Sequence, residues 1–269
     1  MTLILGLSAT YLAVLLLLWA FQERITFPAP RAALPDPQAV LGYGERIELV
    51  MKDGTRLVGW YLPPAASPTA VVPAAAMLWF YGNGETIGAI WPVIRDFRPP
   101  GAALLVVDYP GYGASGGRAS EAGIYEAGAL AYRALASRPG VDPKRIYVYG
   151  RSLGSAVATR TAADFPAAGL ILESPFTSAR DMAARTYRIF PLFLVRLRLN
   201  NVETIRQVHC PVLVFHGTAD RLVPMEMGRR VAEAAPEQKE FVMIDGAGHN
   251  ETYDRGGQAY REKLAQFVR

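Results

Sequence analysis

The sequence predicts an α/β fold in which a mostly parallel sheet of eight strands carries helices on both faces. Short, continuous apolar runs alternate along the chain with longer segments of helical pattern. Continuous apolar strands are typical of a parallel sheet that is buried on both faces, and strand–helix alternation implies right-handed βαβ units. The length of 269 residues suits one such domain with a short extension, since domains of this class commonly run to roughly 200–250 residues.

The expected strands begin with an antiparallel hairpin. Residues 45–50 alternate in polarity, the Asp-Gly pair at 53–54 marks a turn, and residues 56–61 provide the return strand. The other strands are expected over residues 76–81, 103–108, 145–149, 169–172, 211–215 and 240–244. Helices are expected over residues 120–137, 152–165, 225–235 and 256–268.

An apolar segment opens the chain. Residues 3–21 carry no charged side chain and just reach the length of a membrane-spanning helix, which needs about 17–25 residues. A cleaved signal peptide is disfavoured because no basic side chain precedes the segment and no A-x-A-like site ends it. A buried core helix is disfavoured by so continuous an apolar run at the N-terminus. We therefore expect a transmembrane anchor at 1–21, a proline-rich linker at 22–42 and the main domain at 43–269.

The composition excludes several classes of protein. The net charge is only +4, and no run of like charges, zinc-finger spacing or RNA-binding signature predicts a nucleic-acid partner. The lipid bilayer is the expected partner instead, and Arg24 and Arg31 after the apolar segment favour a cytoplasmic main domain. The single cysteine, Cys210, permits no intrachain disulfide and is expected to be a small core residue. No metal-ligand cluster is visible, and no cofactor is expected.

The strongest chemical signal is Gly-x-Ser-x-Gly at residues 150–154, between an apolar strand and a helical segment. Such an elbow needs glycine on both sides of the serine because the turn is strained and neighbouring chain passes close. It exposes the serine hydroxyl near the N-terminus of the helix. We predict Ser152 as a nucleophile and Gly150 and Gly154 as the elbow, with an ordinary strand–helix turn as the alternative.

A serine hydroxyl is a weak nucleophile without a base, and the chain has three histidines. His209 precedes a strand and so belongs to the wrong edge of a parallel sheet. His216 ends that strand and is expected to bond to nearby backbone. His249 follows the last strand in a loop of small residues, and we predict it as the base.

The base needs an acid that orients its ring and balances its charge. Asp220 follows the seventh strand, so the chain order is Ser152, Asp220, His249, which is expected of the G-x-S-x-G fold and not of chymotrypsin or subtilisin. Two alternatives remain. Asp220 could cap the following helix, and Glu173, at the end of the sixth strand, could be the acid.

The tetrahedral intermediate of acyl transfer needs N–H groups aimed at its oxyanion. The backbone N–H of Leu153, directly after the nucleophile, is one predicted donor. The backbone N–H of Asn83, in Tyr81-Gly82-Asn83-Gly84-Glu85 after the third strand, is the other. A phosphate-binding glycine loop is rejected because no G-x-x-x-x-G-K-[ST] pattern follows.

These motifs, with residues 108–113, 173–178 and 216–220, resemble the α/β-hydrolase-domain proteins. The resemblance runs from about residue 25 to the end and is closest to an N-terminally anchored branch, which includes protein depalmitoylases and uncharacterised bacterial relatives. It implies the α/β-hydrolase fold and a triad of Ser152, Asp220 and His249. The sequence departs from the branch in the loop at 81–85, where His-Gly-Asn-Ala-Gly-Asn is usual.

The leading hypothesis is a serine hydrolase, of carboxylesterase, thioesterase or lipase type, that cleaves acyl esters or thioesters on Ser152. The same triad permits a peptidase or amidase, and a non-catalytic binding protein is disfavoured by the complete triad.

The strand–helix alternation breaks at residues 174–209, which mix apolar and arginine side chains and are expected to form a cap. This segment is either surface helices packed on the core or a lid. As a lid it would line an acyl-chain pocket, with Phe193 and Leu194 in its wall and Arg196 and Arg198 at lipid head groups.

Overall fold

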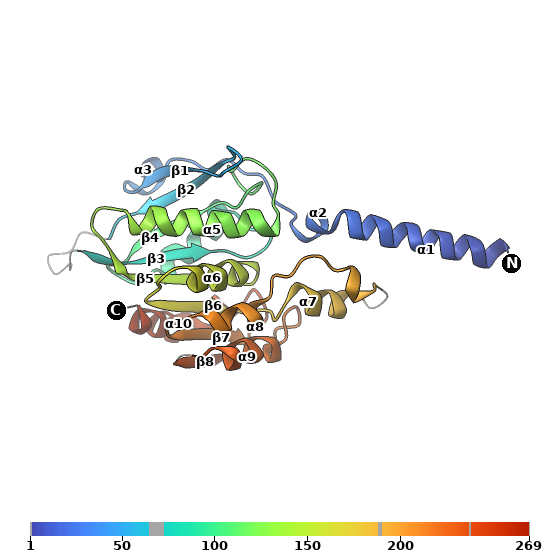
Figure 1. Cartoon of the computed structure of the whole chain (residues 1–269). Helices are drawn as coiled ribbons and strands as arrows, with labels where there is room; N and C mark the ends of the chain where they lie inside the picture. Colours follow the sequence, from blue (N-terminus) through green and yellow to red (C-terminus); the bar gives the residue numbers. More distant parts are fainter. Residues whose placement is uncertain (1, 65–72, 188–189, 237, 269) are drawn as a thin grey trace.

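The computed structural model describes residues 2–64, 73–187, 190–236 and 238–268 (Figure 1). Within these residues eight strands form one sheet in the order β1-β2-β4-β3-β5-β6-β7-β8. They are β1 (Glu45–Val50), β2 (Arg56–Leu62), β3 (Ala74–Phe80), β4 (Ala103–Val107), β5 (Val141–Arg151), β6 (Gly169–Glu173), β7 (Val212–Gly217) and β8 (Lys239–Ile244). β2 is antiparallel to both β1 and β4, and the remaining pairs are parallel. The predicted eight-stranded, mostly parallel sheet with an antiparallel start is confirmed.

The register of β5, β6, β7 and β8 aligns their carboxyl ends. Arg151 at the end of β5 pairs with Glu173 at the end of β6, and Glu173 pairs with Phe215 in β7. Gly217 pairs in turn with Ile244 at the end of β8. The loops that follow these four strands therefore meet at one edge of the sheet, which is where parallel α/β sheets place their ligands.

Helices cover both faces of the sheet. They are α4 (Ile87–Phe97), α5 (Glu121–Ala136), α6 (Leu153–Asp164), α9 (Met225–Ala234) and α10 (Thr252–Phe267). Successive residues of a strand point to opposite faces. Gly150 of β5 faces Ala158 of α6, whereas the Tyr149 hydroxyl contacts that of Tyr260 in α10, so α6 and α10 lie on opposite faces. α4 was not among the expected helices, and it includes Pro92.

The apolar N-terminal segment forms α1 (Thr2–Ala20), which projects away from the domain in Figure 1. No helix among the described residues is long and apolar enough to cross a membrane. This corrects the transmembrane helix predicted for residues 1–21.

The predicted linker, residues 22–42, packs against the domain. It contains two short helices, α2 (Gln22–Thr26) and α3 (Pro37–Leu41). Phe27 and Leu34 are buried in the core. The indole N–H of Trp60 donates to the carbonyl of Pro35, at 3.0 Å, so extended proline-rich backbone is held to β2 by a specific hydrogen bond.

The predicted cap, residues 174–209, lies between β6 and β7 and is described except for residues 188 and 189. Its regular elements are α7 (Ala179–Thr186), η1 (Leu192–Leu194), α8 (Asn201–Thr204) and η2 (Ile205–Gln207). Figure 1 shows α7 at the same end of the molecule as α2. The segment therefore stands beside the N-terminal helices at the edge where the strand ends meet.

Candidate active site

The turn from β5 into α6 holds Ser152 in a strained conformation. Its φ of 49° and ψ of −114° are unfavourable for a residue with a side chain. A Cβ atom on Gly150 would lie 2.3 Å from the carbonyl oxygen of Gly154, and one on Gly154 would lie 2.2 Å from that of Phe80. The backbone N–H of Ser152 donates to the carbonyl of Glu173, at 2.9 Å. Glycine is thus required on both sides of the serine, as the elbow motif predicts.

The structure brings Ser152, His249 and Asp220 together. Nε2 of His249 lies 3.0 Å from Oγ of Ser152, and its Nδ1 lies 2.7 Å from Oδ2 of Asp220. In this geometry Nδ1–H donates to the carboxylate, which leaves Nε2 free to accept the serine proton. The arrangement can therefore generate an alkoxide-like nucleophile and stabilise the imidazolium that forms.

Asp220 is held in place as a carboxylate by several donors. Its Oδ1 accepts the backbone N–H groups of Leu222 and Val223, at 3.0 and 2.8 Å. Burial alone would raise the pKa of Asp220, but hydrogen bonds from His216 and His249 outweigh burial and lower it. Asp220 does not cap α9, because the N-cap position of that helix is Pro224.

The other two histidines lie outside this proton path. Nε2 of His216 is 2.8 Å from the carbonyl oxygen of Val223, in line with the expected backbone contact, and 3.5 Å from Oδ2 of Asp220. A Cβ on Gly228 would lie 2.1 Å from the His216 ring, so a glycine in α9 makes room for it. His209 is exposed and precedes β7, at the edge of the sheet remote from Ser152.

Glu173, the alternative acid, belongs to a separate buried cluster. Its carboxylate accepts hydrogen bonds from Arg151 Nε and the Tyr260 hydroxyl, both at 3.2 Å. The hydroxyls of Tyr149 and Thr252 also donate to it. The alternative is therefore wrong about the pairing, since the carboxylate at hydrogen-bond distance from His249 is that of Asp220.

Arg151 is a site residue that the sequence reasoning missed. The side chain is only 5% exposed and contacts two loops and the end of β6. Nη1 lies 2.6 Å from Glu85, and Nη2 donates to the carbonyl of His249 and the side-chain oxygen of Asn250, at 3.0 and 2.6 Å. With Glu173 on Nε, this one guanidinium connects β6, the loop after β3 and the histidine loop.

The contact with Arg151 also gives a structural account of the unusual loop at residues 81–85. Glu85, which departs from the usual motif, accepts the backbone N–H of Gly82, at 2.6 Å, and pairs with Arg151. Burial opposes the charge of Arg151, but Glu173 and Glu85 more than compensate and raise its pKa. Two features of the sequence could have revealed this ion pair. Arg151 is a charged residue inside an elbow that should be buried, and Glu85 is an acidic residue at an unusual position of the facing loop.

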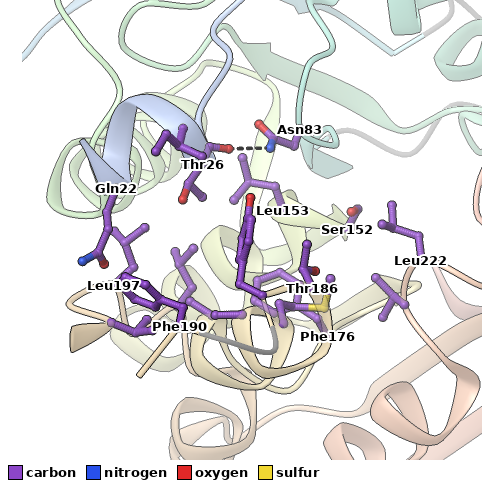
Figure 2. Close-up of a pocket in the computed structure, with 18 of the residues that line it drawn as sticks. Gln22, Thr26, Asn83, Ser152, Leu153, Phe176, Thr186, Phe190, Leu197 and Leu222 are labelled. Atoms are coloured by element: carbon purple, nitrogen blue, oxygen red, sulfur yellow. Dashed lines mark hydrogen bonds between the residues drawn. The ribbon is translucent and has the colours of Figure 1, made fainter. Parts of the chain in front are cut away.

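The predicted oxyanion donors border the same pocket as the nucleophile. Asn83 and Leu153 line this pocket with Ser152 (Figure 2). The side chain of Asn83 is engaged elsewhere, because its Nδ2 donates to the carbonyl of Thr26 and its Oδ1 accepts from the Tyr112 hydroxyl, at 2.7 and 2.6 Å. Leu153 is the first residue of α6, where backbone N–H groups lack helical partners.

The pocket has a volume of about 320 Å³, at the small end of the range of roughly 300–1,000 Å³ for ligand sites. Its lining is mainly apolar and includes the cap residues Phe176, Met182, Tyr187, Phe190, Val195 and Leu197. Phe193 is not part of this wall and is 80% exposed. The expectation that Phe193 and Leu194 form the wall is therefore wrong, since neither lines the cavity: Phe193 lies in the 3₁₀ turn η1 and is exposed, whereas Phe190 and Val195 on either side of this turn line the pocket.

Across the part of the chain that the structure describes, no group of three or more histidine, cysteine or acidic residues is placed to hold a metal ion. Cys210 is buried just before β7, as expected of a core cysteine.

Comparison with known families agrees with this fold and geometry. Residues 72–207 and 192–256 match the family described as "Serine aminopeptidase, S33". The chain therefore belongs to this family and, with it, to the α/β-hydrolase superfamily.

The chain has relatives among bacterial and human proteins. An uncharacterized protein of Mycobacterium tuberculosis is 33% identical over 256 residues, which are 95% of this chain and 90% of that protein. Alpha/beta hydrolase domain-containing protein 17B of Homo sapiens is 36% identical over 169 residues, 61% of this chain and 56% of that protein. A solved esterase of Pyrococcus furiosus has the same fold, with a TM-score of 0.70, 20% identity and coverage of 89% of this chain and 97% of that one.

Proposed function

We propose that the protein is a serine hydrolase that cleaves acyl esters or thioesters through an acyl-enzyme on Ser152. The observation that carries this proposal is the chain of contacts from Ser152 to His249 to Asp220, at 3.0 and 2.7 Å, beside an apolar pocket. The substrates are lipid-like or acylated molecules, since one face of the nucleophile is bordered by apolar side chains.

The proposed reaction has two halves. His249 takes the hydroxyl proton as Ser152 Oγ attacks the acyl carbonyl, and the backbone N–H groups of Asn83 and Leu153 receive the oxyanion. His249 then gives the proton to the leaving alcohol or thiol, which leaves Ser152 acylated. In the second half, His249 deprotonates the water that attacks the acyl carbonyl, and it returns the proton to Ser152 Oγ as the bond to the acyl group breaks and the carboxylic acid leaves.

A peptidase is the second candidate because the matched family is described as a serine aminopeptidase. An aminopeptidase must bind the charged α-amino group of its substrate, and a buried cation requires an anionic partner. None of the described residues that line the pocket is acidic. The lining therefore favours an acyl ester or thioester over a peptide with a free amino end.

We also propose that α1 holds the domain at a membrane surface. Leu5, Leu12 and Leu16 are among its many exposed apolar side chains, and an apolar surface of this extent is typical of a membrane or protein contact. Arg24 next to α1 suits the anionic cytoplasmic leaflet, so we place the domain on that side. Cell fractionation with and without α1, followed by protease treatment of spheroplasts, tests both the attachment and the side.

The test of the catalytic proposal is Ser152→Ala, with Ser137→Ala as a matched control on an exposed helix end. Wild type and the control should react with a fluorophosphonate probe and hydrolyse p-nitrophenyl esters, whereas Ser152→Ala should do neither while remaining folded by circular dichroism. Retained labelling of Ser152→Ala would remove Ser152 from the mechanism. Faster turnover of an aminoacyl anilide than of any ester would favour the peptidase.

A further inference from the structure

The pocket beside Ser152 has one wall that comes from the N-terminal end of the chain. Leu18, Gln22 and Ile25 line it, although they precede the first strand of the sheet. Figure 2 shows Gln22 at the opposite end of the pocket from Ser152. A chain attached to the serine oxygen would therefore run towards α1 and α2.

Gln22 fastens this wall to the cap through both ends of its amide. Its Nε2 donates to the carbonyl of Leu194, at 2.7 Å, and its Oε1 accepts the backbone N–H of Arg196, at 2.8 Å. The guanidinium of Arg196 also lies over the ring of Trp19 in α1, 4.7 Å from its centre. α1 and α2 are thus joined to the cap by side-chain contacts that bridge more than 170 residues of sequence.

The same segment is joined to the oxyanion loop. The carbonyl of Thr26, at the end of α2, accepts a hydrogen bond from Nδ2 of Asn83, at 2.7 Å (Figure 2). Thr26 and Asn83 both line the pocket. The N-terminal segment therefore contacts the far end of the cavity, through Gln22, and the loop beside the nucleophile.

We infer that the junction of α1 and α2 is the distal wall of an acyl-chain subsite, and that Gln22 and Ile25 determine how long a chain the enzyme accepts. This inference rests on the proposed function. The ligand is one acyl chain of medium length, because the cavity has a mainly apolar lining and a volume of only about 320 Å³. An acetyl group remains beside Ser152 and does not reach this wall, whereas a longer chain contacts it.

The position of this wall suggests how such a substrate arrives. Val14, one helical turn before Leu18 and therefore on the same face of α1, is exposed, and Leu18 is partly covered and lines the pocket. The apolar surface of α1 is therefore continuous with the apolar lining of the subsite. A chain that leaves a lipid layer along α1 would enter the pocket without crossing water, and this favours an amphiphile over a freely soluble ester.

Two variants of the full-length protein test the subsite. Ile25→Trp adds bulk to the wall that α2 provides, and Gln22→Ala releases the contact between α2 and the cap. Gln38→Ala is the control, since Gln38 is also a short-helix glutamine that bonds to a backbone carbonyl, that of Gly42, but lies outside the pocket. The measurement is kcat/KM on p-nitrophenyl acetate, butyrate, octanoate and decanoate, with fluorophosphonate labelling as a check on Ser152.

Each methylene that loses its contact should reduce kcat/KM about fourfold. We expect Ile25→Trp to lower kcat/KM on decanoate at least about tenfold, while kcat/KM on acetate and probe labelling stay within about twofold of wild type. We expect Gln22→Ala to shift the preferred chain length. Equal losses on acetate and decanoate, or no loss on either, would overturn the subsite. Retained labelling of Ser152→Ala would overturn the proposed function instead.

Discussion

Two buried carboxylates, Asp220 and Glu173, lie close to the nucleophile, and their different contacts indicate different roles. Glu173 ends β6, and Asp220 follows the neighbouring strand β7 by three residues. Both are buried. Asp220 contacts the ring of His249, which in turn reaches Ser152, whereas Glu173 contacts Arg151 and a set of hydroxyl groups.

The difference between them lies in the partner's ability to change its charge. An imidazole gains and loses a proton during acyl transfer, so a carboxylate beside it stabilises a charge that appears only in the reaction. A guanidinium is always charged, so a carboxylate beside it stabilises that charge equally before, during and after the reaction. We infer that Asp220 acts on the rate and that Glu173 fixes the loops, and substitutions can separate the two.

The largest expected effect is that of Asp220→Asn. The amide no longer accepts the Nδ1 proton well, so His249 presents the wrong tautomer to Ser152, and kcat should fall by about 10⁴. Asp245→Asn, an exposed neighbour in the loop after β8, should leave ester turnover unchanged. Steady-state hydrolysis of p-nitrophenyl butyrate compares the two. Wild-type activity in Asp220→Asn would show that the acid is another residue.

Glu173→Gln should act on stability more than on rate. Breaking one side of a buried ion pair typically costs about 3–5 kcal/mol, because the remaining charge stays buried without full compensation. Glu85 still pairs with Arg151, so kcat of the folded fraction should stay within about tenfold of wild type. Urea unfolding measures the loss, and Glu240→Gln, which breaks the exposed contact with Lys263, should cost about 0–1 kcal/mol. A loss in kcat of about 10⁴ in Glu173→Gln would show that Glu173 and Asp220 do not differ in role.

Much of this molecule follows from local sequence signals. The apolar runs predict the strands, the Gly150–Gly154 elbow predicts the nucleophile Ser152, and the polar residues that follow the strands predict Asp220 and His249. These features depend on short-range signals, namely continuous apolar runs of strand length and the close approach of backbone at glycine. The helix α4 was not anticipated, and it carries Pro92 in its interior.

The contacts that were not predicted join residues distant in sequence. Arg151 and Glu85 are 66 residues apart, and Gln22 and Leu194 are 172 apart. Neither pair produces a periodic pattern. The choice between Asp220 and Glu173 was open for the same reason, since their partners come from other strands and helices. The direction of Phe193 depends on one 3₁₀ turn inside the cap.

Arg151→Lys tests whether the cluster around Glu173 positions His249. Lysine keeps the charge but cannot hold Glu85, Glu173 and the carbonyl of His249 at once. Loss of one charge-assisted hydrogen bond, worth about 1.5–3 kcal/mol, should lower kcat about 10–100-fold with little change in KM for acetate. Arg255→Lys, in an exposed pair with Glu251, is the control. A raised KM at constant kcat would assign Arg151 to substrate binding instead.

The smallest expected effect concerns stability in acid. Because its pKa is lowered in the folded protein, Asp220 binds fewer protons there than in the unfolded chain. Its contribution to stability is therefore complete above the unfolded value of about 3.9 and is lost as the pH falls towards the lowered native pKa. Asp220→Asn removes this titration, so below about pH 4 the free energy of unfolding should fall less steeply, by up to about 1.4 kcal/mol per pH unit. Urea unfolding between pH 3 and pH 6 compares the two proteins. Parallel curves would mean that the histidines do not hold the Asp220 carboxylate ionised, and the contrast with Glu173 would then rest on rates alone.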